Sequence, residues 1–285
     1  TLTIEPCTEV VLNGWGIEVS GASGRIIAHG RPDCPIRFRS TGAGDKSVLA
    51  NHNGFLDLEY VEFVDVGGLP DAFRTGAITL LHDDADNNYS APHVDALRVK
   101  HVTITGAKSH GIALQGNGTF TADSSDLVIT GSGAEPVSFE VRNLIRLPSG
   151  TYTGNAVDEI LVQTLATPVV PMHMVNRGVP YRIGDLGSSS STFVTIGDYD
   201  GNSTTLTIDA GVTVNMDPNT GIRVTGGSAL IAEGTPQDPI VFAGDAGTGW
   251  HGIIYGGYGN LDIASQNRMT HARIENAGTE AGTGS

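Results

Sequence analysis

The feature that most constrains this chain is a long internal repeat, because the same strings of residues occur twice. "IAHGRPDCPIRF" at Ile27–Phe38 returns as "IAEGTPQDPIVF" at Ile231–Phe242, 204 residues later. "TLTI" at Thr1–Ile4 returns at Thr205–Ile208 with the same offset. A fixed internal period is typical of folds built by stacking equivalent units. We therefore predict a module of about 204 residues that begins a second time at residue 205.

Within the module, short apolar patches predict β-strands. They recur every eight to ten residues, and the first are Leu2/Ile4, Val10/Leu12, Ile17/Val19, Ile26/Ala28 and Ile36/Phe38. Each patch alternates apolar with other residues and is followed by Gly, Pro, Asn or Asp, which is a strand–turn pattern. No stretch keeps the spacing of an amphipathic helix over three turns. Short strands also fit a pair of β-sandwiches, but these would give a long-range period nearer ~100 residues.

Three patches span about 23 residues, which predicts one coil of a stacked structure. We expect an all-β fold: a right-handed, single-stranded parallel β-helix, or β-solenoid, with coils of about 23 residues. The first predicted domain is residues 1–204, with a loop insertion at about 68–95 and a connector at about 150–204. The second is residues 205–285, a truncated copy stacked on the first as a continuous solenoid. A β-helix that stops within a module exposes strand edges and core, which predicts further modules or end-to-end self-assembly.

The charge balance excludes some partners. Asp and Glu number 31 against 16 Lys and Arg, for a formal net charge of −15. The sequence has no cluster of basic residues, so it lacks the surface that nucleic acid requires. No apolar stretch reaches the ~18–20 residues of a membrane span. A negative surface attracts cations such as calcium.

The repeated strings resemble a known family when they are combined with "WHGI" at Trp250–Ile253 and "IENAG" at Ile274–Gly278. They resemble the pectin-lyase-like, right-handed parallel β-helix modules of large secreted or surface-anchored bacterial proteins. "YTGNAVDEILV" at Tyr152–Val162 and "GVPYRIGDL" at Gly178–Leu186 are similar to the connector that precedes each new block. The resemblance implies an extracellular or cell-surface location and a structural or adhesive role, with carbohydrate or protein bound at the outer faces.

The two cysteines, Cys7 and Cys34, are predicted to form a disulfide. In a register of 23–27 residues both lie at the same corner of adjacent coils, within reach of each other. The second copy has Gly211 and Asp238 at these places, so both cysteines are lost together. A disulfide indicates an oxidising compartment outside the cytoplasm.

Two acidic stretches are candidate calcium sites, because calcium prefers oxygen ligands. The first set is Asp83, Asp84, Asp86 and Asn87. The second set is Asp198, Asp200 and Asn202. A solvated loop is the alternative for the first. A plain turn is the alternative for the second, where Gly201 stands at the fourth position of the loop instead of the sixth.

The alternative function is a polysaccharide lyase or glycoside hydrolase acting on acidic polysaccharide, since enzymes of the resembled fold carry such activities. Asp83 and Asp84 followed by His110 are similar to part of a hydrolase pattern, although its other parts are missing. For lyase chemistry, Arg98 and Lys100 are the nearest bases in sequence, and they fit outward-facing strand positions equally well. Because no complete catalytic set is found, we expect a non-enzymatic module. No cofactor is expected except the candidate calcium.

Overall fold

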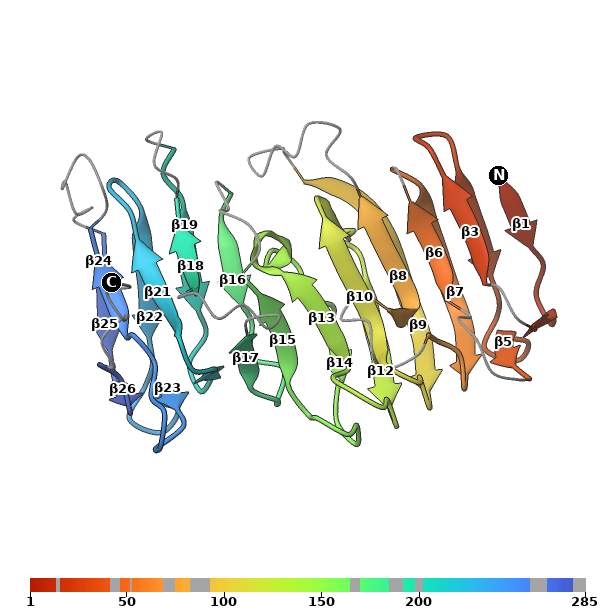
Figure 1. The fold of residues 1–285 in the computed structure, drawn as a ribbon. Coiled ribbons are helices and arrows are strands. Elements are labelled where there is room, and N and C mark those ends of the chain that lie inside the picture. The colour runs from red at the N-terminus through yellow and green to blue at the C-terminus, as the bar shows by residue number, and fades with distance from the viewer. Residues whose placement is uncertain are drawn as a thin grey trace, which may run out of the picture. The chain divides into compact units, whose positions relative to one another are not determined.

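The computed structural model describes residues 1–13, 16–41, 47–51, 53–68, 75–82, 93–164, 170–184, 192–197, 202–256 and 266–278. These residues form β-strands, turns and one short 3-10 helix, η1 (Val141–Asn143), with no α-helix among them (Figure 1). No described helix has the length and hydropathy of a membrane span. The chain divides into two compact units, one of residues 1–139 with 146–160 and one of residues 140–145 with 161–285.

The first unit contains two groups of parallel strands. One has the order β1-β4-β7-β9-β12-β14, with β2 paired to β5, β5 to β7, and β11 to β9. Its strands are β1 (Leu2–Ile4), β2 (Glu9–Leu12), β4 (Arg25–His29), β5 (Ile36–Ser40), β7 (Phe55–Val64), β9 (Val94–Thr105), β11 (Gly118–Phe120), β12 (Ser125–Thr130) and β14 (Gly150–Thr151). The other has the order β3-β6-β8-β10-β13. Its strands are β3 (Ile17–Ser20), β6 (Val48–Asn51), β8 (Gly76–His82), β10 (His110–Gly116) and β13 (Val137–Glu140).

The second unit contains three groups of parallel strands, and β15 (Ile160–Gln163) leads into it. The first group is β16 (Met172–Met174), β19 (Thr205–Ile208), β22 (Ala229–Glu233) and β25 (Arg268–Thr270). The second is β17 (Tyr181–Gly184), β20 (Thr213–Met216), β23 (Ile240–Gly244) and β26 (Ala272–Glu275). The third is β18 (Thr192–Ile196), β21 (Thr220–Val224) and β24 (Ile253–Tyr255).

The core of the first unit consists of columns of apolar side chains. Alternate residues of each strand point inward, and parallel register places like positions over one another. In one column Phe38 pairs in register with Phe63, Phe63 with Ile104, and Ile104 with Ile129. All four side chains are fully buried. The strands predicted from the apolar patches are therefore confirmed as β1 to β5, and the all-β fold with parallel sheets is confirmed and is compatible with a β-solenoid.

The long strands β7 and β9 turn a corner at Tyr60 and His101. Both residues have positive φ, 49° and 50°, and their rings stack with centroids 4.5 Å apart. Before this corner β7 pairs with β4, and after it with β5. In the second copy the same place is taken by His271, with φ 44°, between β25 and β26. The corner is therefore a repeated backbone feature.

The two copies share their strand register. Leu2 pairs with Ile26 and Leu206 with Leu230, so the interval between partners along the chain is the same in both copies. The interval from β2 to β5 likewise equals the interval from β20 to β23. The interval from β3 to β6 equals that from β21 to β24. Equivalent sequence therefore adopts equivalent strand pairing.

The interval between paired residues is not uniform along the chain. Leu127 pairs with Gly150, whereas Leu56 pairs with Leu97, which lies much farther along the sequence from its partner. The stretch expected to be a loop insertion, about 68–95, contains strand β8. Nearly every residue of β8 is buried, so its sequence lacks the alternation by which a strand is recognised. The boundary at residue 205 marks a sequence repeat, and as a domain boundary it stays a prediction.

Candidate functional site

Arg98, on the outward side of β9, has three charged hydrogen-bond partners. Its Nη1 donates to Asp57 Oδ1 at 2.8 Å, its Nη2 to Glu59 Oε2 at 3.0 Å, and its Nε to Asp123 Oδ2 at 2.9 Å. Lys100 Nζ lies 3.0 Å from the same Asp123 oxygen. Asp57 and Glu59 come from β7, and Asp123 from the turn before β12. We call these five residues the Arg98 cluster.

The Arg98 cluster extends across several strands. Asp57 is in register with Arg98, and Glu59 with Lys100, so alternate outward positions of β7 and β9 carry opposite charges. His29 on β4 continues the line, with its Nε2 3.0 Å from Asp57 Oδ1. Opposite charges directly across neighbouring strands stabilise a sheet. Together with His29, the cluster therefore links β4, β7 and β9 with the turn before β12 on the outer face.

The contacts within the cluster shift the pKa of Arg98 and the pKa of Asp123. Partial burial alone would lower the pKa of Arg98, but the hydrogen bonds to Asp123, Asp57 and Glu59 outweigh it and raise that pKa. The hydrogen bond from Arg98, with those from Thr121 and Lys100, holds the pKa of Asp123 well below its ordinary range. A guanidinium held by three carboxylates stays protonated and does not take a proton from a substrate. This arrangement fits a structural ion pair between strands better than the proton abstraction considered for Arg98.

Replacing Arg98 by methionine is expected to lower the free energy of unfolding by about 2 kcal/mol. Removing one partner of a buried charge pair costs about 3–5 kcal/mol, and the effect here is smaller because the Arg98 side chain keeps 18% of its exposure. Chemical denaturation followed by circular dichroism measures the change. The matched control is Arg31→Met, since the Arg31–Asp33 pair is 3.6 Å long and well exposed, and this variant should change stability by less than ~0.5 kcal/mol.

Arg98→Met should also change how the free energy of unfolding depends on pH in the acid range. The folded-state pKa of Asp123 lies below its ordinary value of 3.8, so its contribution is full above that value and is lost as pH falls further. In Arg98→Met this loss should largely disappear, and the two stability curves should converge below about pH 4. If the difference in free energy of unfolding between the wild type and Arg98→Met stays constant from pH 6 down to pH 2, the stabilising role inferred for the Arg98–Asp123 pair is contradicted.

His110, the candidate from the hydrolase pattern, pairs with a carboxylate inside the first unit. Its Nδ1 lies 3.1 Å from Glu135 Oε2, and the two side chains are 4% and 6% exposed. A buried charged or polar group is costly unless a partner lies beside it, and here the imidazole and the carboxylate are neighbours. Both side chains are buried, so the imidazole is not presented at the surface.

The candidate calcium ligands are not described as complete sets. Asp83, Asp84, Asp86 and Asn87 lie outside the described residues, as do Asp198 and Asp200. Asn202 is described and is exposed. Within the described ranges, no group of three or more His, Cys, Asp or Glu side chains is arranged to hold a metal ion. Calcium binding therefore stays a prediction.

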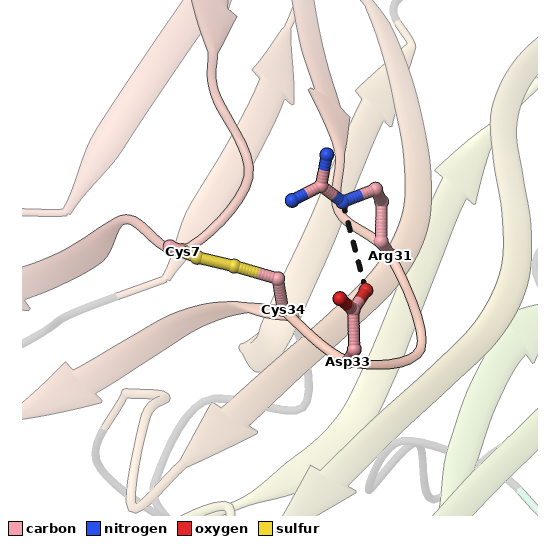
Figure 2. The surroundings of a disulfide bond; sticks show 4 residues. All are labelled: Cys7, Arg31, Asp33 and Cys34. Atoms are coloured by element: carbon pink, nitrogen blue, oxygen red, sulfur yellow. Dashed lines mark ion pairs between the residues drawn. A yellow bond between two sulfur atoms is a disulfide. The ribbon is translucent and has the colours of Figure 1, made fainter.

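The disulfide between Cys7 and Cys34 is present in the structure. The two Cα atoms are 4.8 Å apart, and the cysteines are separated by 27 residues. Figure 2 shows the sulfur atoms joined at the turn that also carries Arg31 and Asp33. The Cys7 amide also donates to the Cys34 carbonyl at 3.3 Å. The bond thus joins two neighbouring turns that the backbone already brings together.

The second copy keeps this backbone contact without the disulfide. The Gly211 amide donates to the Asp238 carbonyl at 3.0 Å, which is the counterpart of the Cys7–Cys34 backbone bond. Cys7 and Gly211 both have positive φ, 64° and 78°. Glycine adopts this conformation freely, whereas in other residues it causes steric strain. The first copy therefore combines a strained residue with a covalent link at the corner.

The sequence left two interpretations open for Arg98 and Lys100, a catalytic base or an outward-facing strand position, and it did not predict the carboxylates that bind them. The alternation of Asp57 and Glu59 with Leu56 and Leu58 was the available signal, since it places both acids on the outer face. Comparison of the chain with models of protein families, with curated proteins and with solved structures gave no match.

Proposed function

We propose that this chain is a module of a structural or adhesive protein with a right-handed parallel β-helix fold, working outside the cell. The observation that carries the proposal is the register that the two copies share at three successive pairs of strands. A unit that repeats its strand pairing adds the same kind of surface with every copy. Such a surface serves extension and contact, whereas catalysis needs one unrepeated set of groups.

The outer face supports this proposal through its ion pairs. Besides the Arg98 cluster, Arg37 pairs with Glu62 at 2.6 Å and Arg39 with Glu9 at 2.8 Å. Both of these pairs link different strands, and the Arg98 cluster links β7 with β9, so the charges strengthen the stack. The disulfide supports a location in an oxidising compartment, because such bonds are rare in the cytosol.

The net charge of −15 restricts the classes of partner that we propose. Direct contact with an acidic polysaccharide is opposed by repulsion between like charges. Neutral carbohydrate or a protein surface is therefore the favoured partner, and acidic carbohydrate requires a bridging cation. We propose that the outer strand faces make this contact.

Incubation of the whole chain with a panel of neutral polysaccharides, uronate-containing polysaccharides and immobilised proteins tests the proposal. We expect retention on neutral glycan or on a protein surface without any cleavage, and retention on uronate glycans only when calcium is added. Binding is measured by solid-phase retention, and cleavage by unsaturated products and new reducing ends. Products that accumulate with time would contradict the structural role and support the lyase or hydrolase alternative. A panel of glycans and proteins without any retention would contradict the adhesive role.

A further inference from the structure

We propose that the open edge formed by β1, β2 and β3, here called the first edge, is a docking surface for one kind of partner. The partner is a layer of strands from another module of this repeat, with the sequence character of β16, β17 and β18. This inference rests on the proposed repeating module and names what that module contacts at one end.

The repeat supplies a covered counterpart for every strand of the first edge. The strands β19, β20 and β21 correspond to β1, β2 and β3. Each has an additional parallel neighbour that precedes it in the chain: β16 beside β19, β17 beside β20, and β18 beside β21. Among the described residues, β1, β2 and β3 have no strand on that side. An open strand edge offers backbone N–H and C=O groups to a further strand.

Burial differs between the two copies where this neighbour is missing. Leu2 is 42% exposed, whereas its counterpart Leu206, the same residue type in the same register, is fully buried. Val10 and Ile17 are half-buried, and their counterparts in β20 and β21 are fully buried. Core-facing apolar surface is therefore left exposed at the first edge and is covered at its counterpart.

A polar contact also fits the same partner. In the second unit His173 on β16 lies 2.7 Å from Asp209 through its Nε2, and the Asp209 amide donates to the Met174 carbonyl at 3.0 Å. Glu5 occupies the place of Asp209 in the first copy and is exposed. A layer like β16–β18 would bring an imidazole to this carboxylate. Backbone, apolar and charged features of the first edge thus match one partner.

The opposite end of a second, identical chain is a poorer match. The strands β24, β25 and β26 correspond to β6 and to the two halves of β7, which the first copy covers with β8 and β9. Ile274 in β26 is 48% exposed, whereas its counterpart Phe63 is fully buried beside Ile104 of β9. The edge formed by β24, β25 and β26 therefore corresponds to an edge that β8 and β9 cover in the first copy. Stacking identical chains end to end would join layers that are not neighbours in the module.

The test is a fusion that places a second copy of residues 170–204 directly before Thr1. Residue 204 precedes the counterpart of Thr1, so the junction keeps the spacing of the repeat. We expect amide hydrogen exchange in β1, β2 and β3 to slow by about tenfold or more relative to the unfused chain. The melting temperature should rise by about 2–4 °C or more.

The matched control is the same fusion with Met172→Asp, Met174→Asp and Ile183→Asp in the added copy only. These residues face the core in the second unit, so the control should leave exchange at the first edge unchanged. Unchanged exchange in the intact fusion, equal protection in both fusions, or loss of the sheet signal in the intact fusion would overturn the proposal. So would association of the unfused chain that protects the first edge as concentration rises, because the partner would then be a second copy. None of these measurements uses glycan binding. A negative result for the docking surface can therefore be distinguished from a negative result for the proposed function.

Discussion

Replacing Phe63 by alanine is expected to lower the free energy of unfolding of the first unit by about 3–5 kcal/mol. Phe63 is fully buried, and its ring stacks on Phe38 with centroids 4.9 Å apart and an interplanar angle of 9°. The substitution removes the buried ring, ends the stacking contact and leaves a cavity between β5 and β9. Urea denaturation followed by circular dichroism measures the loss.

The repeat provides a matched control for this prediction. Ile274 is the counterpart of Phe63 in the second copy, but it is 48% exposed at a strand edge. Ile274→Ala should therefore cost less than about 1 kcal/mol. Phe63→Leu keeps much of the apolar volume and should lose less than half as much as Phe63→Ala. If Phe63→Ala and Ile274→Ala cost the same, the column of buried side chains does not stabilise the first unit as we infer.

Removing the disulfide is expected to destabilise the first unit by about 3.5 kcal/mol. The bond closes a loop between cysteines 27 residues apart, and opening it restores conformational freedom to the unfolded chain. The variant Cys7→Ala with Cys34→Ala tests this, with chemical denaturation as the measurement. Thiol titration of the native wild-type chain should find no free thiol, since both cysteines are bonded.

The second copy again provides the control. The variant Cys7→Gly with Cys34→Ala gives position 7 the residue of that copy and differs from the double alanine variant at this position alone. Glycine tolerates the positive φ of 64° at Cys7, so this variant should be about 1 kcal/mol more stable than the double alanine variant. Equal stability of the two variants would show that the conformation of residue 7 carries no strain. An unchanged denaturation midpoint on loss of the bond would contradict the loop-entropy argument.

Much of the fold followed from local patterns in the sequence. Alternating pairs such as Leu2/Ile4 and Ile36/Phe38 lie in strands as predicted, because one face of each strand must be buried. The cysteine pairing followed from the same reasoning, since both residues stand at one corner of neighbouring turns. Strand β8 was missed because its buried residues do not alternate with exposed ones.

The charged contacts could not be predicted in the same way. Arg98 meets Asp57 across an interval of 41 residues and Asp123 across 25. The first interval depends on how much chain loops out between β7 and β9, which no local pattern fixes. A candidate lyase base therefore proved to be the centre of an ion-pair cluster only when the register was known.

The sequence by itself determined the strands whose residues alternate, the repeat and the pairing of the cysteines, because alternation and period belong to the chain. Only the tertiary structure decided which charges neutralise each other and which core positions stay uncovered. Those outcomes depend on the strand that lies alongside, and the length of chain leading to that strand is greater between β7 and β9 than between β12 and β14. Two copies with the same residues, such as Leu2 and Leu206, therefore differ in burial because, among the described residues, only Leu206 has a neighbouring strand on each side.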